Sequence, residues 1–290
     1  MGRKIFMRFE MKMKVYAGIV TYYPDINLLR KNIESIAHQV DKLIVVDNAS
    51  DNSIEIKKIV DGISNGLLFC NKKNKGIAYA LNLIMETSYE ENANWVLLLD
   101  QDSTCPSNLI QEYLKYAHRL DVAVITPGIN DVNDIDKNEI DKRVELVIEF
   151  ITSGSLNRVD IWRKMGGFNE DLFIDMVDYD YAYRLCNKGY KAIKVNEISL
   201  DHAIGKRSYH RIGIIKCSTY NHNAFRKYYI TRNSLFLART YPEYCNIYLM
   251  YLRIFKRMLI VLLFEENKWE KIINMIKGIR DSKKITKNYK

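Results

Sequence analysis

The chain has 290 residues, of which 48% are hydrophobic and 27% are charged, a balance that is typical of folded globular proteins and excludes disorder over most of its length. A formal net charge of +9 indicates either a basic solvated surface or affinity for anionic partners, such as nucleotide diphosphates, acidic lipid headgroups or nucleic acid. The five cysteines are scattered and form no Cys-x-x-Cys pair, which argues against a zinc site or a disulfide framework and favours a reducing, cytoplasmic compartment.

Strand-like apolar runs alternate with helix-like segments along the first two thirds of the chain. This alternation predicts an α/β fold with a mainly parallel sheet flanked by helices. The expected strands are Val15–Thr21, Lys42–Val46, Gly66–Cys70, Trp95–Leu99, Val122–Thr126, Val144–Thr152 and Lys191–Val195. The expected helices are Ile26–Val40, a segment starting near Ser53, Gly76–Met85, a segment from Pro106 to Arg119, Phe173–Lys188 and most of the chain from Asn223 onward. The polar stretch Gly128–Asp141 is expected to be a surface loop.

The clearest chemical signal follows the fourth expected strand, where the apolar run Trp95–Leu99 ends in Asp100-Gln101-Asp102. Open α/β sheets bind their ligands at the carboxyl ends of the strands. Two carboxylates at such a place, with no basic residue beside them, repel one another unless a cation lies between them. Hard oxygen ligands suit Mg²⁺ or Mn²⁺, which typically bridge a few carboxylates to substrate phosphates. The pattern therefore predicts metal-diphosphate chemistry.

Two earlier strand ends carry further polar residues. Asp47 follows the second expected strand, where a carboxylate accepts hydrogen bonds from a pyrimidine N–H or ribose hydroxyls, although an Asp-Asn pair also suits an ordinary turn. Asn74 and Gly76 precede a helix whose free backbone N–H groups and dipole attract anions. The same two residues are equally compatible with a plain helix entry.

The segment Ile247–Phe264 is strongly apolar but is interrupted by Arg253, Lys256 and Arg257. Its longest uninterrupted run is too short to span a bilayer, which takes about 20 residues. Two interpretations stay open, a helix packed on the sheet domain and an interfacial helix with a basic rim.

Seven pieces of the chain resemble, in order, the motifs of family 2 glycosyltransferases of the GT-A fold, and of bacterial rhamnosyltransferases in particular. The resemblance covers nearly all of residues 14 to 240. The pieces are Val45–Ser50, Asn74–Asn82, Asp100–Asp102, Ser153-Gly154, Gly166–Glu170, Phe173–Asp180 and Arg226–Asn233. It implies a nucleotide-sugar-binding catalytic domain over residues 14–222 and a helical region over residues 223–290.

The resemblance implies that Asp178 is the general base that takes the proton of the acceptor hydroxyl, with Asp175 as the alternative. Related transferases carry a Glu-Asp pair at this point, whereas Val177 precedes the aspartate here. Since Asp175 and Asp178 are three residues apart in an expected helix, they are predicted to share one helical face. An acidic helix start would also suit the helix dipole without any catalytic role.

Other roles follow from the resemblance residue by residue. Asp102 is expected to ligate the metal directly, with His202 as a second ligand. Ser153, Gly154 and Tyr228 are expected to contact the acceptor. The expected donor-binding residues are Thr21, Asp47, Asn74, Gly76, Asn82, Asp100, Gln101, Arg226 and Arg232.

The activity that the resemblance implies is inverting transfer of L-rhamnose from dTDP-rhamnose to a growing, polyprenyl-linked polysaccharide. The cofactor would be Mg²⁺ or Mn²⁺, and the enzyme would work at the inner, anionic face of the cytoplasmic membrane. UDP-galactofuranose, UDP-glucose and UDP-galactose are alternative donors. The broken acidic pair also allows a non-catalytic sugar-nucleotide-binding partner in a glycan assembly complex.

Two other classes fit the sequence less well. A haloacid-dehalogenase-type phosphatase would use Asp100 as its nucleophile, but it would want that residue after the first strand. No motif supports specific nucleic-acid binding, despite the basic charge.

Overall fold

The computed structural model describes residues 13–129, 143–200, 208–212, 215–219 and 221–286, and its centre is an eight-stranded sheet with the strand order β3-β2-β1-β4-β7-β5-β8-β6. Strands β1 to β4 run parallel, β5 pairs with β8 in parallel, and β6 and β7 pair antiparallel with their neighbours. The expected mixed, mainly parallel sheet is therefore confirmed. The strands are β1 (Val15–Thr21), β2 (Lys42–Asp47), β3 (Gly66–Cys70), β4 (Trp95–Asp100), β5 (Val122–Ile129), β6 (Val144–Val147), β7 (Ser155–Arg158) and β8 (Lys191–Leu200).

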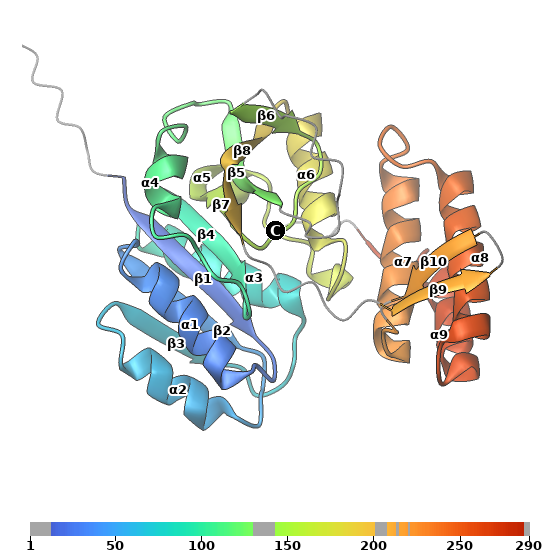
Figure 1. Ribbon diagram of the computed structural model, residues 1–290. Helices are drawn as coiled ribbons and strands as arrows, with labels where there is room; N and C mark the ends of the chain where they lie inside the picture. The colour runs from blue at the N-terminus through green and yellow to red at the C-terminus, as the bar shows by residue number, and fades with distance from the viewer. Residues whose placement is uncertain (1–12, 130–142, 201–207, 213–214, 220, 287–290) are drawn as a thin grey trace, which may run out of the picture.

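Helices cover both faces of this sheet (Figure 1), so its central strands are apolar on both sides. In β4, Leu97 and Leu99 pack toward one core, while Val96 and Leu98 pack toward the other. Helices α1, α2 and α4 cover the first core, and α3, α5 and α6 cover the second. These helices are α1 (Ile26–Ala37), α2 (Ser53–Asp61), α3 (Ile77–Glu90), α4 (Leu109–Leu114), α5 (Val159–Lys164) and α6 (Val177–Asn187), with a short 3₁₀ turn η1 (Glu170–Leu172) before α6.

The chain from Ala224 onward is helical, and Figure 1 shows these helices beside the α/β body in orange and red. They are α7 (Ala224–Thr240), α8 (Ile247–Phe264) and α9 (Lys268–Asp281), and they share a small apolar core of their own. A two-stranded antiparallel hairpin, β9 (Ser208–Ile212) and β10 (Ile215–Thr219), precedes them. None of the helices in the described part of the chain has the length and apolar character needed to cross a membrane.

Helix α7 is held against α9 by close packing and against the end of α8 by an ion pair. A Cβ at Gly278 of α9 would lie 2.7 Å from the backbone oxygen of Tyr228, so the two helices approach at a distance that only glycine allows. The buried Glu265 forms ion pairs with Lys227 of α7 at 2.6 Å and with Lys271 of α9 at 3.0 Å. Because removing one partner would leave a buried charge unpaired, this cluster ties the end of α8 to both other helices.

The structure corrects three expected elements. The helix expected from Phe173 begins only at Val177, because the preceding turn has left-handed backbone angles. The expected strand Val144–Thr152 ends at Val147, and the unexpected β7 follows at Ser155–Arg158. The last strand of the sheet continues from Val195 to Leu200. Most of the expected loop Gly128–Asp141 lies outside the described residues.

Candidate active site at the carboxyl edge of the sheet

Three neighbouring strands end at one edge of the sheet, and each brings a residue predicted to bind the donor. Thr21 closes β1 and lies in register with Asp47 at the end of β2, while Asp100 closes β4 next to Val20. The parallel order β2-β1-β4 brings these three strand ends to one edge because all three strands point the same way. The register places Thr21 and Asp47 on one face of the sheet and Asp100, which is paired with Val20, on the other. The edge that the sequence predicts as the binding edge is therefore lined by these polar residues.

The Asp47 carboxylate is fully buried and already has protein partners. It accepts hydrogen bonds from the Thr21 hydroxyl at 3.0 Å and from the backbone N–H of Ser50 at 3.0 Å. Asn48 beside it donates to the backbone oxygen of Gly76 at 3.1 Å, which connects the end of β2 to the amino end of α3. Asp47 thus organises the loop that follows β2.

The Asp100–Asp102 segment is anchored through its backbone, which leaves its carboxylates at the edge. Asn32 donates to the backbone oxygen of Asp100 at 2.6 Å, and the backbone N–H of Asp100 donates to the Ser153 hydroxyl at 3.1 Å. Gln101 accepts a hydrogen bond from the backbone N–H of Tyr22 at 2.8 Å. Asp102 is half-buried, and the described residues supply no hydrogen-bond partner for its carboxylate.

The amino end of α3 is partly occupied by protein acceptors. The N–H of Gly76 donates to the Asn74 side chain at 2.9 Å, and the N–H of Ile77 donates to the backbone oxygen of Phe173 at 2.6 Å. Gly76 has a φ of +89°, and a Cβ there would lie 2.6 Å from that Phe173 oxygen. Asn74 and Gly76 therefore fit this helix entry closely against the turn around Phe173.

That turn, residues 172–176, is strained. Phe173, Asp175 and Met176 have φ values of +62°, +63° and +67°. At Phe173 the backbone N–H of Ile174 reaches back to the oxygen of Leu172 at 2.7 Å, which is the rare γ-turn. Each such residue costs about 1–3 kcal/mol, so other contacts must hold the turn in place.

Asn233 of α7 supplies those contacts. Its side chain is completely buried, and its amide nitrogen donates to the backbone oxygens of Leu172 at 2.8 Å, Ile174 at 2.8 Å and Asp175 at 2.9 Å. Arg232 adds a hydrogen bond to the Leu172 oxygen at 3.3 Å. The turn at 172–176 is thus fixed from α7, 58 or more residues further along the chain.

The turn delivers two carboxylates to the edge of the sheet. Asp175 forms an ion pair with Arg226 of α7 at 3.0 Å. Asp178 lies in the first turn of α6 and accepts the backbone N–H of Tyr179 at 2.9 Å. Burial, together with the nearby charges of Asp175 and Asp100, raises the pKa of Asp178 to about 7. A carboxyl group with that pKa is suited to take a proton at neutral pH.

The predicted helical face for Asp175 and Asp178 is wrong, because Asp175 precedes α6 and has left-handed backbone angles. The two carboxylates still lie close enough for the charge of Asp175 to act on Asp178.

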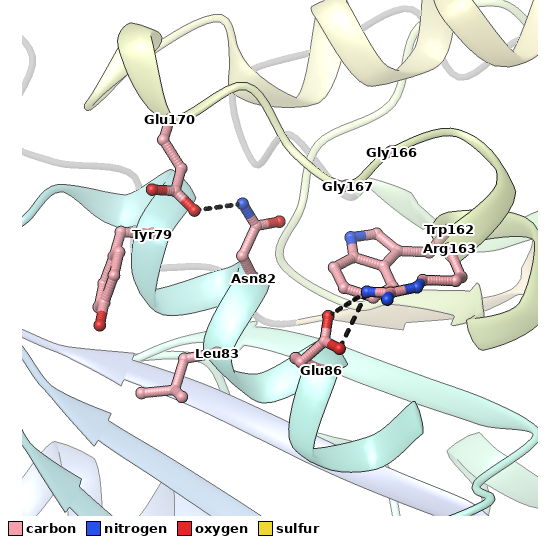
Figure 2. A pocket seen from close by; sticks show the side chains of 9 residues that line it. All are labelled: Tyr79, Asn82, Leu83, Glu86, Trp162, Arg163, Gly166, Gly167 and Glu170. Carbon is pink, nitrogen blue, oxygen red and sulfur yellow. Dashed lines mark hydrogen bonds and ion pairs between the residues drawn. The ribbon is translucent and has the colours of Figure 1, made fainter. Parts of the chain in front are cut away.

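Asn82 lies further along α3 and binds the protein itself. Its amide donates to the Phe168 oxygen at 2.9 Å and to Glu170 at 2.9 Å, as Figure 2 shows for the second bond. It lines a cavity of about 310 Å³ between α3 and α5, where Arg163 pairs with Glu86 at 2.7 Å. Asn82 thereby holds the segment that leads into η1 and the turn at 172–176.

The remaining predicted residues have varied surroundings. The Ser153 hydroxyl lies 2.6 Å from that of Ser103, and the N–H of Gly154 donates to the Leu98 oxygen at 2.8 Å, so both fix the end of β4. Tyr228 and Arg232 face the end of α9 and η1, and Tyr228 donates to Asp281 at 3.4 Å. His202 lies outside the described residues.

Near Asp175, sequence reasoning gave Asn233 no role of its own within the segment Arg226–Asn233, and it missed His222. Asn233 stands among the polar residues Thr231, Arg232 and Ser234, so the sequence alone does not mark it as a buried amide. His222 is half-buried, and its pKa is lowered by burial and by Arg226 while Asp175 raises it. A single histidine outside any motif is likewise not marked by the sequence.

The donor set fits a divalent cation held jointly with a substrate. No three His, Cys, Asp or Glu side chains among the described residues converge closely enough to hold a metal by themselves. Where Mg²⁺ binds together with a phosphate-bearing ligand, it is usually held by one or two carboxylates, phosphate oxygens and water. Asp102, with its unengaged carboxylate beside Asp100, matches that requirement.

Comparison with known proteins gives one family and one fold. The model of the family described as glycosyl transferase family 2 matches residues 18–171. The dTDP-rhamnosyl transferase RfbF of Shigella flexneri is 29% identical over 245 residues, which cover 79% of this chain and 81% of that protein.

Solved structures show the same fold at low identity. A Pyrobaculum calidifontis mannosyltransferase in complex with GDP-Man and Mn²⁺ aligns with a TM-score of 0.59 at 16% identity, covering 94% of this chain and 76% of that one. S. aureus TarS in complex with UDP-GlcNAc aligns with a TM-score of 0.57 at 12% identity, covering 93% and 81%. The α/β architecture is therefore that of GT-A glycosyltransferases.

We expect Asn233→Asp to destabilise the protein by about 3 kcal/mol or more, because a carboxylate would face three backbone oxygens that have lost their donor. Urea unfolding followed by circular dichroism measures this change. Asn274→Asp is the matched control, since Asn274 bonds only within its own helix α9. Equal loss of stability in both variants would contradict the role given to Asn233.

We also expect the free energy of unfolding to depend on Asp178. The native carboxyl, with a pKa of about 7, keeps its proton between about pH 4 and 7, whereas the unfolded one, with a pKa of 3.8, loses it. The native state therefore binds more protons in this range, and stability falls as the pH rises. Asp178→Asn removes this loss, so the variant gains up to about 4 kcal/mol over the wild type from about pH 4 to 8 in EDTA. Asp61→Asn, on the exposed end of α2, controls for loss of an aspartate; parallel curves for wild type and Asp178→Asn would refute the assignment.

Proposed function

Because this chain belongs to glycosyl transferase family 2, we propose that it transfers L-rhamnose from dTDP-β-L-rhamnose to a hydroxyl group of a growing polysaccharide, with inversion at the anomeric carbon. The observation that carries the proposal is the convergence of Asp178, Asp175 and Asp100 at the carboxyl edge of the sheet. The donor choice is supported by the relative described as a dTDP-rhamnosyl transferase. UDP-galactofuranose, UDP-glucose and UDP-galactose are the competing donors. Membership of this family leaves no place for the phosphatase interpretation.

The proposed reaction is a single displacement. The acceptor hydroxyl oxygen forms a bond to the anomeric carbon while the bond from that carbon to the diphosphate oxygen breaks. Asp178 takes the hydroxyl proton, and the electron pair of the broken bond leaves with the nucleoside diphosphate. The raised pKa of Asp178 supports this role, and the ion pair with Arg226 leaves Asp175 less suited to it.

The donor would lie across the ends of β1, β2 and β4. Asp47, held by Thr21, would accept from the base or ribose, and Asp100 would contact the ribose. Gln101, Asn74 and Gly76 would shape the same pocket, while Asn82 would support it from α3. Arg226 and Arg232 bring positive charge from α7 toward this edge, which favours a diphosphate.

Asp102 would hold Mg²⁺ or Mn²⁺, and such an ion would neutralise the charge that develops on the leaving diphosphate. The solved mannosyltransferase that shares the fold contains Mn²⁺, which supports a divalent cation here. His202 is the proposed second ligand.

The proposed acceptor is a polyprenyl-linked glycan at the inner face of the cytoplasmic membrane. Ser153, Gly154 and Tyr228 are the proposed acceptor contacts. No specific nucleic acid is part of the proposal. The net charge of +9 is instead assigned to the anionic donor and to an anionic lipid surface.

The test is to incubate the purified protein with Mg²⁺ or Mn²⁺ and a panel of nucleotide sugars, and to measure release of the free nucleoside diphosphate. We expect metal-dependent release from dTDP-rhamnose. Asp178→Asn should lower the rate by about 10²- to 10⁴-fold while nucleotide affinity is retained. Asp102→Ala should remove the metal dependence together with the activity.

Asp61→Asn on α2 is the control and should keep wild-type turnover. Release from a UDP-sugar would overturn the rhamnosyl assignment and keep the mechanism. Near-normal turnover of Asp178→Asn would remove it as the base. Absence of binding to every donor in the panel would reject the proposed function.

A further inference from the structure

An apolar surface lies open on the two C-terminal helices. In α8, the side chains of Tyr248, Leu252, Phe255, Leu259 and Leu263 are 79%, 64%, 61%, 43% and 58% exposed. In α9, those of Trp269, Ile273 and Ile276 are 74%, 52% and 53% exposed. These eight residues are named the hairpin surface below.

The spacing shows that this exposure belongs to whole helix faces. Five of the seven large apolar residues exposed on α8 recur every three or four positions, as do the three on α9, so each set forms a stripe along one helix face. The opposite face of α8 carries Met250, Ile254 and Val261, which are buried against α7 and α9. Helix α8 is therefore already packed on one side, and its second apolar side has no cover within the described residues. Exposed apolar stripes of this kind mark an interaction site.

The positive charge around the hairpin surface indicates which kind of partner can bind there. Residues 247–286 contain nine Lys or Arg and four Asp or Glu, and one of those acids, Glu265, is buried between two lysines. Arg253 and Lys256 are exposed on α8 beside the apolar stripe. A second copy of the chain would bring the same positive charge against itself, which is unfavourable. Apolar and aromatic side chains with a basic rim are instead the composition of helices that lie in the headgroup layer of an anionic bilayer.

We propose that α8 and α9 dock on the surface of an anionic lipid bilayer through the hairpin surface. Leu263 and Trp269 stand at the loop end of the two helices, next to Glu265. Glu265 pairs with Lys227, whose neighbour Arg226 holds Asp175 in the candidate site. The docked end of the hairpin therefore lies beside the site where an acceptor would react. This last link rests on the proposed function, whereas the binding to lipid does not.

Tryptophan fluorescence tests the docking directly. The chain has three tryptophans, and Trp95 and Trp162 are 2% and 3% exposed, so only Trp269 can pass from water into lipid. Vesicles of phosphatidylcholine with phosphatidylglycerol should shift the tryptophan emission of the protein to the blue. Vesicles that also contain brominated lipid should quench this emission. Trp269→Phe should abolish the shift while co-sedimentation with the vesicles persists.

Surface variants test which residues carry the binding. Leu252→Glu with Phe255→Glu should weaken co-sedimentation with anionic vesicles by at least about tenfold, because two large side chains lose their burial in lipid. Both residues are exposed, so the fold should tolerate the change. Ile54→Glu with Leu120→Glu is the matched control, since these side chains are 67% and 80% exposed on the α/β body. It should bind like the wild type.

Three results would overturn the proposal: no co-sedimentation with anionic vesicles, equal binding to phosphatidylcholine alone, or a dimer in lipid-free solution that the Leu252→Glu, Phe255→Glu variant converts to a monomer. These measurements use no nucleotide sugar. Failure of the docking is therefore distinguished from failure of the proposed function, which the release of nucleoside diphosphate reports separately.

Discussion

The hydrogen bonds from Asn233 to the turn at 172–176 are the constraint on which the candidate site depends. Three left-handed residues in a four-residue stretch are unfavourable by themselves, and the chain around them offers little compensation. The buried amide of Asn233 meets three backbone oxygens of this turn, and Gly76 lets α3 approach it from the other side. The candidate site is therefore formed by the carboxyl edge of the sheet together with helix α7.

Electrostatic interactions explain what the strained turn at 172–176 contributes to the candidate site. The turn places Asp175 before the first residue of α6 and Asp178 in its first turn. Burial raises the pKa of Asp178, and the nearby charges of Asp175 and Asp100 act in the same direction. Repulsion among these groups destabilises the free protein, and a cation with a diphosphate would relieve it. The same arrangement that costs stability therefore favours a ligand of that chemistry.

The sequence could predict the parallel core, because apolar runs such as Trp95–Leu99 and the residues that end them are local signals. It could also predict that Asp47 and Asp100 lie at the same edge of the sheet, since parallel strands end at one edge. It could not predict β7, a four-residue strand without an apolar run, whose pairing depends on distant neighbours. Nor could it predict the turn before α6, because Asn233 overrides the helical tendency of Phe173–Met176 from a remote helix. Local sequence patterns predict most helices and strands, whereas β7 and the turn before α6 depend on hydrogen bonds to residues distant in the sequence.

The most direct test of this account is the titration of the Asp178 carboxyl by ¹³C NMR in the metal-free protein, assigned by comparison with Asp178→Asn. The account predicts a pKa of about 7 in the wild type. It also predicts a fall toward the ordinary value of about 4 in Asn233→Ala, where the turn at 172–176 is released. An ordinary value in the wild type, or an unchanged value in a folded Asn233→Ala variant, would contradict the claim that α7 fixes the site.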